Sequence, residues 1–157
     1  MSLYRPTDVD AAYEAWGADC GPCALAALLG REVEAVRTLL DEGFPKRRYM
    51  NPTHMLEALD RAGVRYEHTG GFPSRGLAFI QWEGPWTAPG AKVAWAYRHT
   101  HWIAVDGDQF YDVNADQWVP RADWERHMPE LIREGVKGAT GGWYVRRGFV
   151  IAQGGQA

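Results

Sequence analysis

The chain has 157 residues, about the size of one domain, and its 46% hydrophobic and 24% charged residues are typical of a globular protein. A net charge of −3, with basic residues only in short pairs such as Arg47-Arg48 and Arg146-Arg147, argues against a nucleic-acid-binding surface. No apolar run approaches the ~20 residues of a membrane span, and the first residues lack the apolar core of a secretory signal, so a cytoplasmic location is expected.

Four helices are expected in the first part of the chain, because apolar residues recur there at helical spacing and glycines end each segment. They are expected at residues 7–17, 20–30, 32–43 and 51–63, with a loop at 44–51. Thr7 or Asp8 is the expected cap of the first helix. The second is apolar on nearly all sides, which is typical of a buried helix.

Short segments rich in β-branched and aromatic residues follow, separated by Gly, Pro and Asp, and they are expected to be strands. These segments are residues 64–69, 77–83, 92–99, 101–106 and 109–114, with a final strand or hairpin at 142–152. A late helix is expected at 120–135, weakened by Pro129 unless a new helix starts there.

Helices followed by mostly antiparallel strands predict an α+β fold, because a doubly wound sheet would alternate the two kinds of element. We expect one domain over residues 1–151 and a flexible tail over residues 152–157.

The segment "DCGPCALAALLG", which begins at Asp19, contains a Cys-Gly-Pro-Cys sequence that matches the dithiol signature of thioredoxin-like proteins. Such a dithiol follows a central buried strand, whereas only 19 residues precede Cys20 and they are predicted to be loop and helix. Metal binding is also disfavoured: His99 and His101 could add ligands to Cys20 and Cys23, but no second pair has structural-zinc spacing. We expect neither a metal nor a cofactor.

Cys20 occupies the first turn of the predicted buried helix, where unpaired N–H groups and the helix dipole favour a thiolate. Asp19 can cap this helix, Gly21 allows a substrate backbone to come close, and Pro22 is tolerated because its missing N–H has no helical partner there. Cys20 is therefore a candidate nucleophile, while Cys23, one turn further on, is expected to be packing.

A nucleophilic cysteine needs a base, and the segment starting at His101 is predicted to form a β-hairpin. A turn centred on Asp106-Gly107, which we favour, sets His101 opposite Asp112, whereas a turn centred on Gly107-Asp108 sets it opposite Asn114. In both registers Asp112 and Asn114 share a face with His101, because strand side chains alternate. Either could orient the imidazole ring.

These segments together resemble the papain-like cysteine peptidases, in particular the group that processes bacteriocins with double-glycine leaders. The residues that carry the resemblance are Asp19-Cys20-Gly21-Pro22-Cys23-Ala24-Leu25, the "NPTHMLEALDRAGV" segment, His101-Trp102-Ile103-Ala104-Val105 and Tyr111-Asp112-Val113, within roughly residues 10 to 115. The resemblance implies a papain-like fold, with a helical N-terminal half packed on an antiparallel sheet. It also implies a triad of Cys20, His101 and Asp112.

Two positions depart from the family pattern. Glu14 stands six residues before Cys20, where the family has a Gln that donates to the oxyanion, and Val113 replaces a Pro. An ionised carboxylate cannot donate a hydrogen bond, and loss of one oxyanion donor costs roughly 100- to 1000-fold in rate.

The sequence thus predicts a cysteine peptidase or amide hydrolase that acts on a peptide or protein through an acyl-enzyme. Trp102 and Trp82 could border its substrate groove or could belong to the core. Two alternatives remain open: a binding or adaptor module on the same fold without catalysis, which Glu14 favours, and a thiol-disulfide oxidoreductase that uses Cys20 and Cys23.

Overall fold

The computed structural model describes residues 3–152, so the expected tail lies outside the described residues except for Ala152. The helices are α1 (Val9–Trp16), α2 (Cys20–Leu29), α3 (Val33–Val36), α4 (Phe44–Arg47), α5 (Pro52–Arg61), α6 (Val93–Tyr97) and α7 (Arg121–Gly135). Short 3-10 helices lie at Arg37–Leu39 and Pro85–Thr87. The strands are β1 (Tyr66–Thr69), β2 (Arg75–Trp82), β3 (Thr100–Asp106), β4 (Gln109–Asp112), β5 (Gln117–Pro120) and β6 (Trp143–Ile151).

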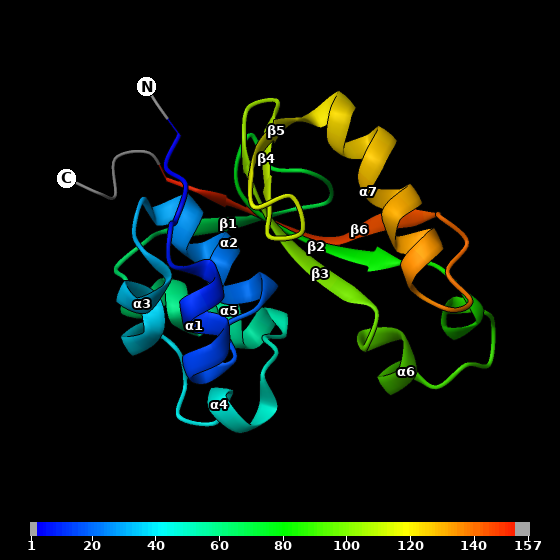
Figure 1. Cartoon of the computed structure of the whole chain (residues 1–157), viewed down its shortest axis with the longest axis horizontal. Coiled ribbons are helices and arrows are strands. Elements are labelled where there is room, and N and C mark those ends of the chain that lie inside the picture. Colours follow the sequence, from blue (N-terminus) through cyan, green and yellow to red (C-terminus); the bar gives the residue numbers. More distant parts are fainter. Residues whose placement is uncertain (1–2, 153–157) are drawn as a thin grey trace.

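The six strands form one antiparallel sheet in the order β1-β6-β2-β3-β4-β5. Helices α1 to α5, which we call the helical lobe, gather on one side of the sheet, while α7 lies on the other side (Figure 1). Two separate hydrophobic clusters correspond to this arrangement, one shared by the helical lobe and the sheet and one beneath α7. The predicted α+β fold is confirmed.

Helix α2 is the centre of the helical lobe and has the predicted bounds. Residues 21–28 are all buried, and their mostly small side chains allow the helix to lie close against the sheet. Gly30 ends the helix with a φ of +69°, a left-handed conformation that favours glycine. The first residue of this helix is therefore held by a well-packed apolar body.

The helices at the start of the lobe differ in detail from the prediction. The Asp8 side chain makes no cap bond to α1, because its carboxylate accepts the N–H groups of Val33 and Glu34 at 2.8 Å at the start of α3. The helix expected at 32–43 ends as a 3-10 turn at Leu39, and the expected loop at 44–51 contains α4. A bidentate ion pair between Asp41 and Arg47 at 2.7 and 2.9 Å holds this turn.

Two further segments show tertiary structure overriding local preference. The strand expected at 92–99 is wrong, because residues 93–97 form α6. The buried Gln81 side chain donates at 2.9 Å to the carbonyl of Ala96, so a tertiary hydrogen bond satisfies the end of this short helix. Helix α7 continues through Pro129, and β5 was not predicted.

The β3–β4 hairpin has the second of the two registers considered. Asp106 pairs with Gln109, so the turn is Gly107-Asp108 and the favoured Asp106-Gly107 turn is wrong. Gly107 has a φ of +62° at the first turn position, where glycine is favoured because it has no Cβ. The ladder ends at the Ala104–Tyr111 pair, so among described residues the stretch of β3 that carries His101 has no β4 partner.

Candidate active site

Cys20 is the first residue of α2 and is half-buried. Asp19 precedes it in an extended conformation and makes no side-chain cap bond, although its carbonyl accepts the Cys23 N–H at 3.1 Å. Within residues 3–152, the N–H groups of Cys20 and Gly21 have no hydrogen-bond acceptor. Two free donors and the positive end of the helix dipole thus lie beside the thiol.

His101 and Asp112 form a buried pair, with 2.8 Å between His101 Nε2 and Asp112 Oδ1. Asp112 is 0% exposed and accepts two further hydrogen bonds at 2.8 Å, from Trp124 Nε1 and from the Asn114 backbone N–H. The His101 ring lies 6.0 Å from the Trp82 ring, between centroids. The bond through Nε2 fixes the ring and leaves Nδ1 for another partner.

The Cys20 thiol lies close enough to His101 to influence its ionisation. Burial lowers the pKa of His101, but the charge and hydrogen bond of Asp112, followed by the nearby Cys20, raise this pKa well above the usual value. Helix α2, which begins at Cys20, packs against β3, which carries His101. The imidazole therefore lies between a carboxylate and a thiol.

Asp112 is held in its ionised form in spite of its burial. Burial raises its pKa, but the His101 charge, the His101 and Trp124 hydrogen bonds and the Asn114 N–H outweigh this and lower the pKa below the usual value. A buried carboxylate with three donors is stable only when it is ionised, and this favours the protonated imidazole next to it.

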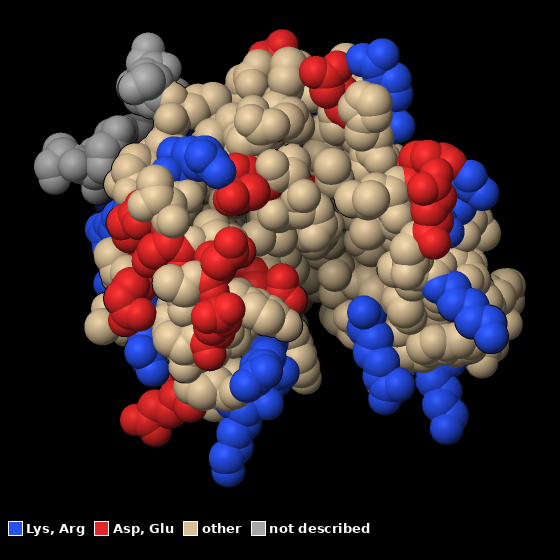
Figure 2. All heavy atoms as spheres, in the orientation of Figure 1, with Lys and Arg blue, Asp and Glu red and all other residues tan. Residues whose placement is uncertain are grey.

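A cavity of about 880 Å³, which we call the Cys20 cleft, opens in front of the thiol. The helical lobe forms one wall, and α6 with the sheet forms the other; Figure 2 shows the hollow open at the lower edge of the molecule. The lining residues used below are Asp19, Cys20, Arg48, Phe79, Tyr97, Arg98, Trp102 and Arg147. His101 is 7% exposed and is not among the described lining residues, so it reaches the cleft through Cys20.

The two walls meet at Trp102, whose ring nitrogen donates at 2.8 Å to the carbonyl of Met50 in the helical lobe. Met50 also packs on Gly21, where an added Cβ would come within 2.8 Å of its sulfur. Gly21 is therefore needed to let Met50 close the wall beside Cys20, in addition to the substrate access that the sequence predicted.

Several predicted site residues lie elsewhere. The exposed Glu14 on α1 does not line the cleft among the described residues, and Trp82 lies in the cluster beneath α7 rather than at the groove. The exposed Asn114 supports Asp112 through its backbone alone, because β4 ends at Asp112 and residue 114 lies in the following turn. By contrast, Trp102 and the exposed Asp19 line the cleft.

Sequence reasoning missed Trp124, which is fully buried and bonded to Asp112. The signal that could have found it is a single Trp in a highly charged helix. Such a Trp is expected to face the core, where its indole N–H requires an acceptor. Its acceptor lies 12 residues away on another element, so the sequence alone did not indicate the partner.

The other residues that the sequence considered for metal or redox chemistry lie as follows. Residues 3–152 contain no group of three or more His, Cys, Asp or Glu side chains that could hold a metal ion. His99 stacks on Trp86, with 3.5 Å between ring centroids. Cys20 and Cys23 are free thiols; burial, then the charge of Cys20, raises the pKa of Cys23, so this thiol stays protonated.

Across residues 3–152, every helix is too short or too polar to span a lipid bilayer. Comparison of the chain with protein-family models, with curated proteins and with solved structures finds no match. The site geometry is therefore what supports a function for this chain.

Proposed function

We propose that the protein is a cysteine hydrolase of papain-like type that cleaves amide bonds in peptides through an acyl-enzyme. The observation that carries this proposal is the buried His101–Asp112 pair beside Cys20, which itself lines a cleft of about 880 Å³. A nucleophile, its base and a group that orients the base are the elements that such catalysis requires.

In the first step His101 takes the proton of Cys20, and the thiolate attacks the amide carbon to form a C–S bond. His101 then gives the proton to the leaving amine as the C–N bond breaks, which leaves an acyl-enzyme. Water attacks the acyl group with His101 as base, which releases the acid and restores the thiol. Asp112 stabilises the imidazolium through its Nε2 bond throughout.

The oxyanion that forms during attack needs donors near Cys20. Glu14 lies outside the cleft, so the proposal assigns this role to the free backbone N–H groups of Cys20 and Gly21 at the start of α2. Fixed donors of this kind stabilise developing charge without reorganisation. A site without a side-chain donor is expected to be slower than one that has it.

The test uses a panel of fluorogenic peptide amides with varied sequences. Cys20→Ala is expected to lose all hydrolysis above background, while Cys23→Ala, the matched control one helical turn away, retains most of it. Unchanged hydrolysis in Cys20→Ala would refute the proposal. Loss of function in Cys23→Ala with retained stability would instead favour the thiol-disulfide alternative.

The binding-module alternative is favoured by the absence of Glu14 from the cleft. It predicts that Cys20→Ala binds peptides as tightly as the parent protein and that neither hydrolyses any peptide in the panel.

A further inference from the structure

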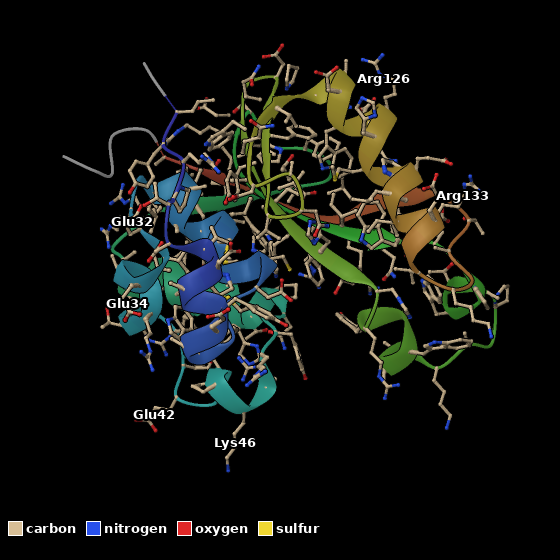
Figure 3. The ribbon with its side chains drawn as sticks, in the orientation of Figure 1. Glu32, Glu34, Glu42, Lys46, Arg126 and Arg133 are labelled. Carbon is tan, nitrogen blue, oxygen red and sulfur yellow. The ribbon has the colours of Figure 1, made fainter. Side chains whose placement is uncertain are left out.

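The Cys20 cleft differs in charge from the molecule as a whole. Its described lining contains three arginines, Arg48, Arg98 and Arg147, and one carboxylate, Asp19, so it carries two net positive charges in a chain whose net charge is −3. The acidic side chains Glu32, Glu34 and Glu42 point outward from the helical lobe (Figure 3). The net charge of the cleft lining thus has the opposite sign to that of the whole chain.

Among the described residues, these arginines have no carboxylate partner. No carboxylate among residues 3–152 lies within 4.0 Å of the guanidinium groups of Arg48, Arg98 or Arg147, and all three residues are exposed. Seven of the other described arginines form ion pairs with carboxylates, as Arg47 does with Asp41. The cleft therefore holds cationic groups that are free to bind an external anion.

In each of the two arginine pairs of the sequence, one arginine has a partner within the protein and the other lines the cleft. Arg47 pairs with Asp41, and Arg146 donates to Gln81 Oε1 at 2.7 Å and lies 4.5 Å from the centroid of the Tyr97 ring. Their neighbours Arg48 and Arg147 line the cleft instead. One member of each pair stabilises the wall, and the other is presented to the cavity.

Both arginines of these pairs that line the cleft, Arg48 and Arg147, lie at irregularities of the backbone. A bulge in β6 skips Arg146 and sets Arg147 opposite Phe79, on the sheet face that carries Trp102. Arg48 has a φ of +61°, a left-handed conformation that favours Gly or Asn at the end of a helix. Such a conformation is uncommon for a residue other than glycine; among the described residues, Asp116 also has it.

Arginines stand on both walls, with Arg48 in the helical lobe and Arg98 and Arg147 on the side of α6 and the sheet. Figure 2 shows Lys and Arg atoms on both rims of the hollow. Between them lie three aromatic side chains: Tyr97, which is 38% exposed, and beside it Phe79 and Trp102, which are only 2% and 1% exposed. The cleft thus combines an apolar floor with cationic rims.

We infer that the Cys20 cleft selects acidic peptides, in which carboxylates flank an apolar residue near the cleaved bond. This inference rests on the proposed function for the cleavage step, but the charge preference itself does not. The rim arginines bind the flanking carboxylates, and the apolar residue packs on the exposed ring of Tyr97, which Phe79 supports. Clefts lined by one sign of charge concentrate ligands of the opposite sign.

The first test alkylates Cys20 with neutral iodoacetamide and with anionic iodoacetate, and locates the label by mass spectrometry. The measured quantity is the ratio of the iodoacetate rate to the iodoacetamide rate, divided by the same ratio for N-acetylcysteine amide. At low salt this normalised ratio is expected to be about ten. It falls toward one at about 1 M salt, where charges are screened within about 3 Å.

The combined variant Arg48→Gln, Arg98→Gln and Arg147→Gln is expected to lose most of this preference. The control is Arg126→Gln on α7, since Arg126 pairs with Asp123 and lies far from the hollow (Figure 3). Equal normalised ratios in the parent protein and in the triple variant would overturn the inference. Slow reaction with iodoacetamide alone would count against the proposed function and leave the ratio interpretable.

The second test measures binding to Cys20→Ala by calorimetry, with acetyl-Glu-Glu-Phe-Glu-Glu amide and its all-Gln counterpart. The acidic peptide is expected to bind at least about tenfold more tightly, and the triple variant to bind both equally. Equal affinity in Cys20→Ala, or failure of both peptides to bind, would overturn the inference. Because this readout needs no catalysis, it separates failure of the charge preference from failure of the proposed hydrolysis.

Discussion

The two halves of the candidate active site are held by different forces. Cys20 starts a helix whose next eight residues are buried, and apolar packing fixes its position. His101 and Asp112 belong to a buried polar cluster in which Asp112 accepts three hydrogen bonds. The nucleophile is therefore held by the packing of its helix, and the base by directed hydrogen bonds.

The two halves are expected to respond differently to amino-acid substitution. Apolar packing is non-directional and tolerates small shifts, whereas a buried polar cluster fails when one donor or acceptor is lost. Substitutions in the His101–Asp112 half are therefore expected to affect activity and pH dependence, and substitutions of the apolar residues that hold Cys20 chiefly stability.

Apart from loss of the nucleophile itself, the largest effect is expected from Asp112→Asn. The amide keeps the shape of the carboxylate but cannot stabilise an imidazolium, so hydrolysis of the best peptide of the panel should fall by roughly 10²- to 10⁴-fold. Measured kcat together with circular dichroism distinguishes this from unfolding. Retention of more than about a tenth of the parent rate would show that Asp112 does not support the base.

Leu25→Ala probes the apolar half, since Leu25 is 0% exposed in the centre of α2. We expect a loss of about 2–5 kcal/mol in the free energy of unfolding, from lost burial and the cavity left behind. Because no charge is involved, the loss should be the same at every pH, as measured by urea denaturation.

His101→Gln provides the contrast in the same measurement. The raised pKa of His101 means that its stabilising contribution is complete below the usual value of 6.5 and is lost as the pH rises through the raised value. The lowered pKa of Asp112 means that its contribution is present above the usual 3.8 and is lost as the pH falls through the lowered value. The cost of the variant should therefore be greatest between these limits, and a cost independent of pH would contradict the ion pair.

Trp124→Phe removes one of the three donors to Asp112 while conserving an aromatic ring in the core. We expect a loss of about 1–3 kcal/mol in the free energy of unfolding, because a buried carboxylate loses a hydrogen bond. The pKa of Asp112 should rise, which an NMR titration of its carboxyl carbon would detect. An unchanged titration would show that Trp124 only fills space.

The smallest effect is expected from Asn114→Ala. Its side chain is exposed, and the bond to Asp112 comes from the backbone N–H, which alanine retains. Activity and stability should stay within about 0.5 kcal/mol of the parent values. A loss comparable to that of Asp112→Asn would assign the orienting role to the Asn114 side chain instead.

The parts that could be predicted from the sequence were those set by local pattern. The buried helix after Cys20 and its glycine end follow from composition and capping, and alternation along the hairpin put Asp112 on the His101 face in either register. The segment 92–99 was misread because α6 depends on contacts with β2. Trp124 and the unpaired Arg48 and Arg147 were beyond sequence reasoning, because their roles depend on residues distant in the chain.

The most direct test of the central claim is the rate of Cys20 alkylation by iodoacetamide from about pH 5 to about pH 9, in the parent protein and in His101→Gln. A free thiol loses reactivity about tenfold per pH unit below its usual pKa of about 8.5. At mildly acidic pH, Cys20 is expected to react faster in the parent protein than in His101→Gln, because the imidazole takes the proton of the thiol. A free-thiol profile in both proteins would contradict it.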